Sequence, residues 1–483
     1  MAKPDVILKI LDGALGILPT LAGGIPAVVG YTTKGALNTP TPHASASALR
    51  AEFGDQGIAV EYACYSIEYT GRPVVFIRVD KATDGSYGTL NDDLVTGTSV
   101  ITVDATVKPN DEYDFVFLVT KGGTIGTSGI LYQYSLDGGR SFSPEAALGT
   151  ANTLTITSAN IRIAFAAGTL ILGDTATVRT EAPIWDATTL QAGLDALKNS
   201  TLAWEFVAVC GKATATDAGN LNAFLTALET TSKKYRWGIC NTRRPNEGES
   251  EATYLSSLST AFASFSSVYV SVCAGYAKTL SSVSRRLPKR PVMISVGTRA
   301  TDVPIQTSLA QVDLGPLPGV SLPDTKGNPD DHDESLNPGL DDARFTVLRT
   351  FEGFSGAYVN LPRIMSGVTS DFQRIHLRRV INAAATALRS TLVNRLHKPV
   401  RIDGTTGYIL EQDAKDIETA AYSALRDAVL SSGAASSASF VLSRTDNLLS
   451  TSTLNGEARV VPLGYPEFIL VNLAFENPAL ITV

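Results

Sequence analysis

The sequence contains WEFVAVC at residues 204–210, YRWGICN at residues 235–241, VYVSVC at residues 268–273 and PVMISV at residues 291–296. Each run is short and rich in β-branched, aromatic or cysteine residues, and a segment of helical composition separates it from the next one. Alternation of this kind is typical of βαβ units on a mostly parallel sheet. We therefore predict an α/β domain over residues 184–343, which ends in a long loop rich in proline and glycine.

A different composition precedes this domain. Residues 86–183 are rich in Thr, Gly, Val and Ile and show no helical periodicity, so we predict a β-rich inserted domain. One motif within it resembles the Asp-box hairpin, in which the aspartate holds a turn and performs no catalysis. The residues that carry this resemblance, and so imply a hairpin here, are Ser135, Asp137, Gly139, Ser141 and Phe142.

Helical periodicity returns in the C-terminal part, residues 344–475. Apolar residues recur there at three- and four-residue spacing in two stretches, which predicts two amphipathic helices. Beyond the helices we predict two paired strands, Glu457–Leu463 and Glu467–Phe475, with a turn around Gly464. The first helix is marked by Leu377, Ile381, Ala384, Leu388, Leu392 and Leu396, and the second by Ile417, Ala421, Ala424, Leu425 and Ala428, with Gly433 as its stop signal.

The composition is that of an ordered, multidomain protein. The chain has 483 residues, of which 44% are hydrophobic and 18% charged, and its net charge of −7 argues against a nucleic-acid partner. No stretch approaches the roughly 20 apolar residues of a membrane span, and the first residues lack the apolar core of a signal peptide. We therefore expect a protein that is made and kept in the cytoplasm, without membrane insertion and with reduced cysteines.

Three cysteines offer the main alternative to a structural role. Cys210, Cys240 and Cys273 each end a predicted strand, and the carboxyl ends of parallel strands share the sheet edge where α/β enzymes place their sites. An enzyme with a thiolate or metal site at this edge is one hypothesis. The other is that the three residues are buried as small hydrophobic side chains, which is the more common state of free cysteine.

Other sequence features point less clearly to chemistry. The run Asp330, Asp331, His332, Asp333 and Glu334 could bind a cation, but it lacks the glycine and the ordered spacing of a calcium loop. We expect a solvated acidic loop there. The four histidines show no metal-ligand spacing, and the sequence has no phosphate-binding or nucleophile-elbow motif. We predict no catalytic residue, no cofactor and no metal site.

Both ends of the chain resemble the contractile phage tail sheath family, which includes tailocins and related contractile injection systems. Near the N-terminus, GIPAVVGY at 24–31, KGALNTP at 34–40 and VVFIRV at 74–79 are similar to the opening strand, the following loop and the next strand of that family. Towards the C-terminus, VLRT at 347–350, AYVN at 357–360, the two predicted helices and RVVPLGYPEF at 459–468 appear in the order found in the family.

The resemblance implies a fold. It implies a tail-sheath-like core made of residues 21–85 and 344–475, into which the α/β domain and the β-rich domain are set. Residues 1–20 and 476–483 are expected to be arms that leave the body. The predicted fold class is therefore α/β and α+β multidomain, with a parallel-sheet domain and a β-rich insertion.

The resemblance also implies a function. Sheath subunits add terminal strands to the sheets of neighbouring subunits, polymerise helically around an inner tail tube, and contract to drive the tube through a target envelope. Arg374, Arg378 and Arg389 fall on one stripe of the first C-terminal helix, which is either an ordinary solvated face or a contact with an acidic inner tube. The residues expected to take part in strand addition are Val6, Ile7, Leu8, Ile10, Phe468, Leu470, Leu473 and Phe475.

The partners implied by the resemblance are other copies of the chain, an inner tail tube protein, and baseplate and tail terminator proteins. No nucleic acid and no membrane insertion is implied. The expected location is the tail of a virion, after assembly in the cytoplasm of the host bacterium.

Overall fold

The computed structural model describes residues 24–322 and 329–473. The chain forms two compact units, residues 1–386 and residues 387–483, and each is described here by itself. The predicted arms at residues 1–20 and 476–483 lie outside the described residues. No helix of the described residues is long and apolar enough to cross a membrane.

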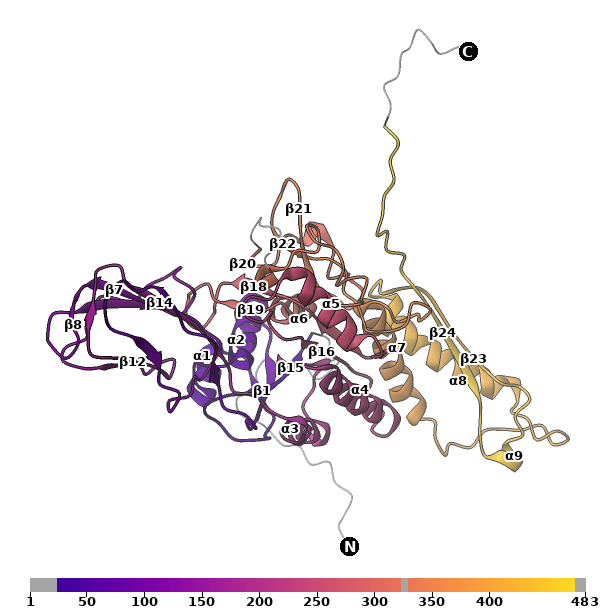
Figure 1. Ribbon diagram of the computed structural model, residues 1–483. Helices are drawn as coiled ribbons and strands as arrows, with labels where there is room; N and C mark the ends of the chain where they lie inside the picture. Colours follow the sequence, from indigo (N-terminus) through magenta and orange to yellow (C-terminus); the bar gives the residue numbers. More distant parts are fainter. Residues whose placement is uncertain (1–23, 323–328, 474–483) are drawn as a thin grey trace, which may run out of the picture. The chain divides into compact units, whose positions relative to one another are not determined.

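A six-stranded sheet forms the centre of the first unit (Figure 1), with the strand order β17-β16-β15-β1-β3-β2. All neighbours are parallel except β2, which runs antiparallel to β3. The parallel sheet predicted from the sequence is confirmed, and the N-terminal strands share it. The strands are β1 (Pro26–Tyr31), β2 (Thr41–His43), β3 (Val74–Val79), β15 (Phe206–Lys212), β16 (Trp237–Asn241) and β17 (Val270–Cys273).

Helices cover both faces of this sheet, because successive strand residues point to opposite sides. Val28 packs in one core with α1, α2 and α6, whereas Ala27 and Val29 pack in a second core with α3, α4 and α5. Both cores are therefore apolar, as expected for a parallel sheet. The helices are α1 (Ala46–Phe53), α2 (Ile58–Thr70), α3 (Ala187–Asn199), α4 (Ala215–Thr230), α5 (Glu251–Phe262) and α6 (Met293–Asp302).

The prediction of a strand over residues 291–296 is wrong. Only Lys289–Pro291 is a strand (β19), and the rest of the run opens helix α6, whose residues from Met293 to Thr301 are all buried. The run at 291–296 is too short and too apolar to show a helical period by itself, so periodicity cannot tell it from a buried strand. The Asn241 side chain accepts a hydrogen bond from the Met293 N–H at 3.2 Å and so helps to fix the helix start.

Residues 86–181 contain strands and no helix, which confirms a β-rich region at the position of the predicted insertion. Its entry and exit strands pair antiparallel, with Ser86 opposite Glu181. A core that includes Phe115, Phe117 and Ile163 is separate from the two cores of the central sheet. The strands are β4 (Ser86–Tyr87), β5 (Asn91–Leu94), β6 (Ile101–Val103), β7 (Asp114–Lys121), β8 (Gly123–Thr124), β9 (Leu131–Ser135), β10 (Ala146–Ala147), β11 (Thr153–Ile156), β12 (Ile161–Phe165), β13 (Thr169–Leu170) and β14 (Thr175–Glu181).

Short strands complete the first unit. β18 pairs with β19 and with β20, and β21 forms a hairpin with β22. Two turns of 3-10 helix, η1 (Val312–Leu314) and η2 (Pro329–Asp331), lie in the predicted long loop. The strands are β18 (Tyr276–Thr279), β20 (Val320–Ser321), β21 (Leu348–Phe351) and β22 (Phe354–Val359).

Both predicted C-terminal helices are present. Helix α7 (Ile375–Val393) begins in the first unit and ends in the second, and α8 (Glu411–Leu425) continues as a π-helical segment, η3 (Arg426–Leu430). Gly433 follows with a positive φ of 67°, as expected of a glycine that ends a helix.

The predicted pairing of the last two strands is wrong. The first of them is present as β24 (Gly456–Pro462), but its antiparallel partner is β23 (Ala435–Leu442), which the sequence did not indicate. A short helix, α9 (Leu448–Thr451), lies between the two strands. The described part of the second predicted strand, residues 467–473, forms no strand.

The Asp-box turn of the β-rich domain is held as predicted. Asp137 is buried and accepts hydrogen bonds from the Ser135 hydroxyl at 2.7 Å, and from the Ser141 N–H at 2.9 Å and hydroxyl at 2.7 Å. Burial alone would raise the pKa of Asp137, but these hydrogen bonds hold it below its ordinary value. The carboxylate is therefore a structural acceptor that ties the two sides of the turn together.

Replacing Asp137 with Ala leaves these donors without their acceptor. We expect Asp137→Ala to lower the free energy of unfolding by about 1–3 kcal/mol, because buried donors lose a charged acceptor. Urea unfolding followed by circular dichroism measures the change. Ser141→Ala removes only the hydroxyl bond and should cost less, and equal losses from both variants would contradict the central role of the carboxylate.

Candidate functional site

An apolar C-terminal segment of the second unit is exposed to solvent. Phe468 is 85% exposed, and Leu470 and Leu473 are each 95% exposed. Ile469 and Val471, between them, are exposed as well. Consecutive apolar side chains of this kind are uncommon on a soluble monomer and mark interaction surfaces. Of the other residues predicted for strand addition, Val6, Ile7, Leu8, Ile10 and Phe475 lie outside the described residues.

A two-stranded sheet in the same unit has open edges. β23 and β24 pair only with each other among the described residues, so no further strand pairs with the outer side of either one. At Leu442, side chains occupy the edge of β23: its N–H donates to Glu418 at 2.9 Å, and its carbonyl accepts from Arg444 at 2.8 Å. One face of the hairpin packs on α8 through Phe440 and Leu442. The other face is exposed and carries Ser439 opposite Arg459, with the exposed Val441 and Val461 on either side. The hairpin is thus anchored on one face, and its strands have no further strand partner along their edges among the described residues.

The three arginines predicted to contact a tube do not share one surface. Arg378 is buried, pairs with Glu229, and lies with its guanidinium 4.3 Å from the ring centre of Tyr269. It therefore stabilises the first unit and is not available on its surface. Arg374 is half-buried, and Arg389 is exposed.

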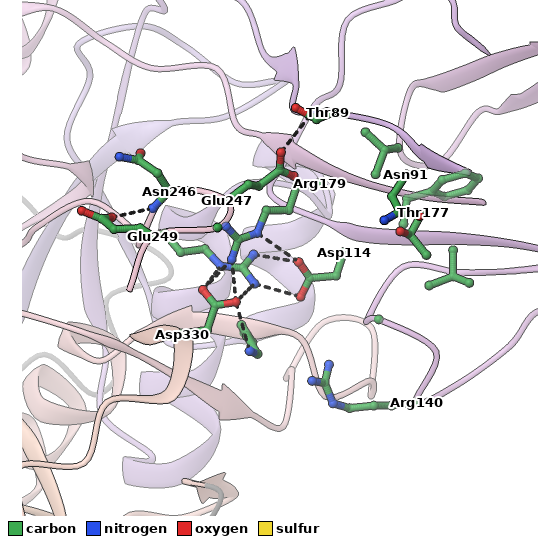
Figure 2. Close-up of a pocket in the computed structure, with 17 residues that line it drawn as sticks. Thr89, Asn91, Asp114, Arg140, Thr177, Arg179, Asn246, Glu247, Glu249 and Asp330 are labelled. Carbon is green, nitrogen blue, oxygen red and sulfur yellow. Dashed lines mark hydrogen bonds and ion pairs between the residues drawn. The ribbon is translucent and has the colours of Figure 1, made fainter. Parts of the chain in front are cut away.

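A charged joint connects the β-rich domain to the rest of the first unit (Figure 2). Arg244, which follows β16, lies 2.8 Å from Asp114 of β7 and 3.0 Å from Asp330 of η2. Arg179 of β14 also pairs with Asp330, with 2.6 Å between its Nη2 and the carboxylate Oδ2. Lys289 of β19 lies 3.2 Å from Asp330. Figure 2 shows Asp114, Arg179 and Asp330 close together. These three residues, Arg244 and Lys289 line a cavity of about 640 Å³.

The acidic run around this joint is not a solvated loop, so that expectation is wrong. Asp331, His332, Asp333 and Glu334 are all buried. His332 lies 3.0 Å from Glu251 and 2.9 Å from Glu334. Burial alone would lower the pKa of His332, but the hydrogen bonds with these two carboxylates raise it above its ordinary value.

The edge of the sheet where α/β enzymes place their sites is covered by the chain itself. The sequence returns from the β-rich domain across the carboxyl ends of β1 and β15, where the Trp185 indole N–H donates to the Cys210 carbonyl at 2.9 Å. A cavity of about 20 Å³ remains between Tyr31 and Glu181, which is room for little more than a water molecule. A larger cavity of about 880 Å³ lies beside it, lined by Lys212, Arg243 and other residues.

The three cysteines do not form one site. Cys210 and Cys273 pack in the core on one face of the sheet, whereas Cys240 packs in the core on the other face. Burial raises the pKa of Cys240 to about 12 and also raises the pKa values of Cys210 and Cys273, so all three remain thiols. Among the described residues, no group of three or more His, Cys, Asp or Glu side chains is placed to hold a metal ion.

Residues 3–361 match the protein family described as DUF2586, N-terminal domain. The chain belongs to the DUF2586 family. No curated protein matches it.

This DUF2586 protein has the fold of contractile tail sheath proteins. A protein of the anti-feeding prophage baseplate aligns with a TM-score of 0.52 at 12% identity, over 99% of both chains. The contracted helical sheath of the anti-feeding prophage gives a TM-score of 0.52 at 12% identity, over 98% of this chain and 99% of that one. The contracted PVC sheath of an extracellular contractile injection system gives 0.53 at 8% identity, over 98% of both chains.

The ion pairs of Asp330 in the charged joint should make the free energy of unfolding depend on pH. Burial alone would raise the pKa of Asp330, but Arg244 and Arg179 lower it far below its ordinary value of 3.8. Since the folded pKa is the lower one, this stabilisation is fully present above the ordinary pKa and is lost as the pH falls below it. We expect Asp330→Asn to unfold at lower urea concentration than the wild type at pH 7, and the difference to narrow towards pH 3.

Asp195 provides the control, because it is an exposed aspartate on α3. Asp195→Asn should stay close to the wild type at both pH values. A difference between Asp330→Asn and the wild type that stayed constant with pH would contradict the role of the charged pair.

Proposed function

We propose that this protein is the structural subunit of a contractile tail sheath, which polymerises helically around an inner tube and contracts to drive the tube through a target envelope. The observation that carries the proposal is the combination of an exposed apolar segment, residues 468–473, with a hairpin whose two edges are open. The sheath fold supports it. Two of the similar structures are sheaths in the contracted state.

Strand addition explains how these two features would work together. An extended segment that adds to an open sheet edge gains affinity from main-chain hydrogen bonds and specificity from alternate side chains. A donor and an acceptor at different places on one chain make a heterologous contact, which repeats as a helix. Phe468, Leu470 and Leu473 are the described donors, and Val6, Ile7, Leu8, Ile10 and Phe475 complete the proposed set.

Contact with an inner tube is the second part of the proposal. We keep Arg389 and Arg374, which are exposed and half-buried, as candidates for holding an acidic tube, and leave out Arg378 because it is buried in the first unit. The proposed partners are copies of the chain, the tube protein, and baseplate and tail terminator proteins. The proposed location is the tail of a virion or related particle, assembled in the bacterial cytoplasm, and no cofactor is required.

The alternative, an enzyme with a site at the cysteine edge, has little support. Its three thiols lie on different faces of the sheet, and the chain itself covers the edge beside Cys210. A pocket with a convergent acid and base would be needed. The cavity of about 880 Å³ instead carries paired charges, since Lys212 lies 2.5 Å from Glu181 and Arg243 lies 2.6 Å from Glu249.

Negative-stain electron microscopy of the purified chain at high concentration tests strand addition. We expect hollow, striated tubes from the wild-type chain and none from a chain that ends at Leu463 or carries Leu470→Asp and Leu473→Asp, because a charged donor strand cannot pack on its acceptor. Val368→Asp is the control: it places a charge at an apolar position that is 83% exposed in the first unit. Tubes from the truncated chain would contradict the proposal.

Sedimentation with the purified tube protein tests the second contact. We expect Arg374→Ala with Arg389→Ala to reduce the amount of sheath that sediments with tubes, and added salt to reduce it in the wild type as well, because exposed charges are screened. Arg285→Ala, which removes an exposed arginine of the first unit, should behave as the wild type. Unchanged binding by the double variant would remove these two arginines from the contact.

A further inference from the structure

One carboxylate, whose side chain is 11% exposed, joins the N-terminal strand to helix α7. Glu205 immediately precedes β15, and its side chain accepts hydrogen bonds from the Arg379 guanidinium of α7 at 2.5 Å and 3.1 Å. The same carboxylate accepts the backbone N–H of Gly24, which lies just before β1, and the indole N–H of Trp237 at 3.4 Å. Sequence reasoning missed this junction, because its members lie far apart along the chain.

The N-terminal side of the junction admits little change. The Glu205 N–H donates to the Ile25 carbonyl at 2.8 Å, so both the backbone and the side chain of Glu205 bind the start of β1. Gly24 has a φ of 83°, and a Cβ atom there would lie 2.6 Å from the Thr301 carbonyl oxygen. A side chain at residue 24 would therefore clash with backbone. The chain passes through this point on its way from the N-terminal segment into the sheet.

The C-terminal side is equally well fixed. Arg379 is 2% exposed and also donates to the carbonyls of Val303 and Pro304, each at 3.3 Å. Its neighbour Arg378 pairs with Glu229, so two successive arginines fix the first part of α7 to the first unit. The same helix continues past residue 386 into the second unit, which contains the hairpin and the exposed apolar segment.

Two segments lead from the first unit towards neighbouring subunits: the N-terminal segment before Gly24 and helix α7, which continues into the second unit. We call them the connecting segments, and we propose that a pulling force between them is carried by Glu205. This inference rests on the proposed strand exchange, since only then are both ends pulled by neighbouring subunits. Force on the N-terminal segment reaches Gly24, and force on the second unit reaches Arg379. Both residues bind one carboxylate, so the force passes from one connecting segment to the other through Glu205. The start of β1 and the first part of α7 would therefore stay in place during contraction.

Single-molecule pulling on the full-length chain tests this directly. The four native cysteines are buried, so DNA handles can be attached through Ala2→Cys and the exposed position Ser390→Cys. Glu205→Gln keeps the shape of the side chain and removes its charge. At constant force we expect Glu205→Gln to unfold about ten-fold faster than the wild type or more, because the variant leaves Arg379 buried without its counter-charge. Arg379→Lys, which loses the two-pronged geometry, gives a second test should Glu205→Gln fail to fold.

Glu61→Gln is the matched control, because Glu61 is a buried glutamate 3.1 Å from the buried Arg290 and touches neither connecting segment. It should lower the melting temperature much as Glu205→Gln does, yet unfold under this pulling geometry at a rate near that of the wild type. Equal acceleration by the two variants, or none by Glu205→Gln and Arg379→Lys, would overturn the inference. A wild-type chain that forms no tubes would instead refute the strand exchange while leaving the pulling result intact.

Discussion

The structure of the first unit depends on the position of β1 in the middle of a parallel sheet. Its neighbours are β3 on one side, from residues 74–79, and β15 on the other, from residues 206–212. Parallel neighbours cannot be joined by a tight turn, so each connection must cross a face of the sheet. The connection from β3 to β15 contains α3 and the whole β-rich domain. Such a long connection is tolerated, since the entropic cost of closing a loop rises only slowly with its length. Since β4 and β14 pair where the insertion enters and leaves, it extends the crossover without separating its ends.

This arrangement also explains why the switch point of this sheet, where related sheets often bind ligands, is covered by the chain itself. The switch of direction falls between β1 and β15, since α2 crosses one face and α3 the other. The chain that returns from the β-rich domain crosses that point and buries Trp185 against β15. Elsewhere the β-rich domain is joined to the body by ion pairs, among them Arg179 with Asp330, which Arg244 and Lys289 also approach.

The sequence predicted those features that depend on local pattern. The strands β15, β16 and β17, the β-rich region, the Asp137 turn and the helices α7 and α8 all follow from periodicity, composition or a short motif. The predictions from sequence were wrong where the structure of a segment depends on which distant segment it packs against. The run at 291–296 opens a helix that packs with α2 in the core of the first unit, and β24 pairs with β23 and not with the segment that follows it.

Charged residues were the least predictable from sequence. The run from Asp331 to Glu334 has the composition of a solvated loop, yet all four residues are buried. Lys289 from β19 pairs with Asp331, and His332 lies between Glu334 and the remote Glu251. The arginines of α7 likewise have the pattern of a solvent-exposed helix face. Nothing near them in the sequence indicates that Arg378 pairs with Glu229 and Arg379 with Glu205. A buried charge needs a partner, and a partner distant along the chain leaves no local pattern.

The second unit combines features that favour association between chains with features that limit how chains can associate. Open strand edges and an exposed apolar segment both favour association with other chains. The exposed face of the hairpin is mixed: Val441 and Val461 are half exposed, but Glu457 and Arg459 place charges between them. Stacking another sheet on this face would bury those charges, which is costly. In the proposed strand addition the incoming segment instead pairs with an edge, where backbone hydrogen bonds fix its direction and register. Edge pairing of this kind would suit ordered polymerisation, because the same contact can repeat at every subunit.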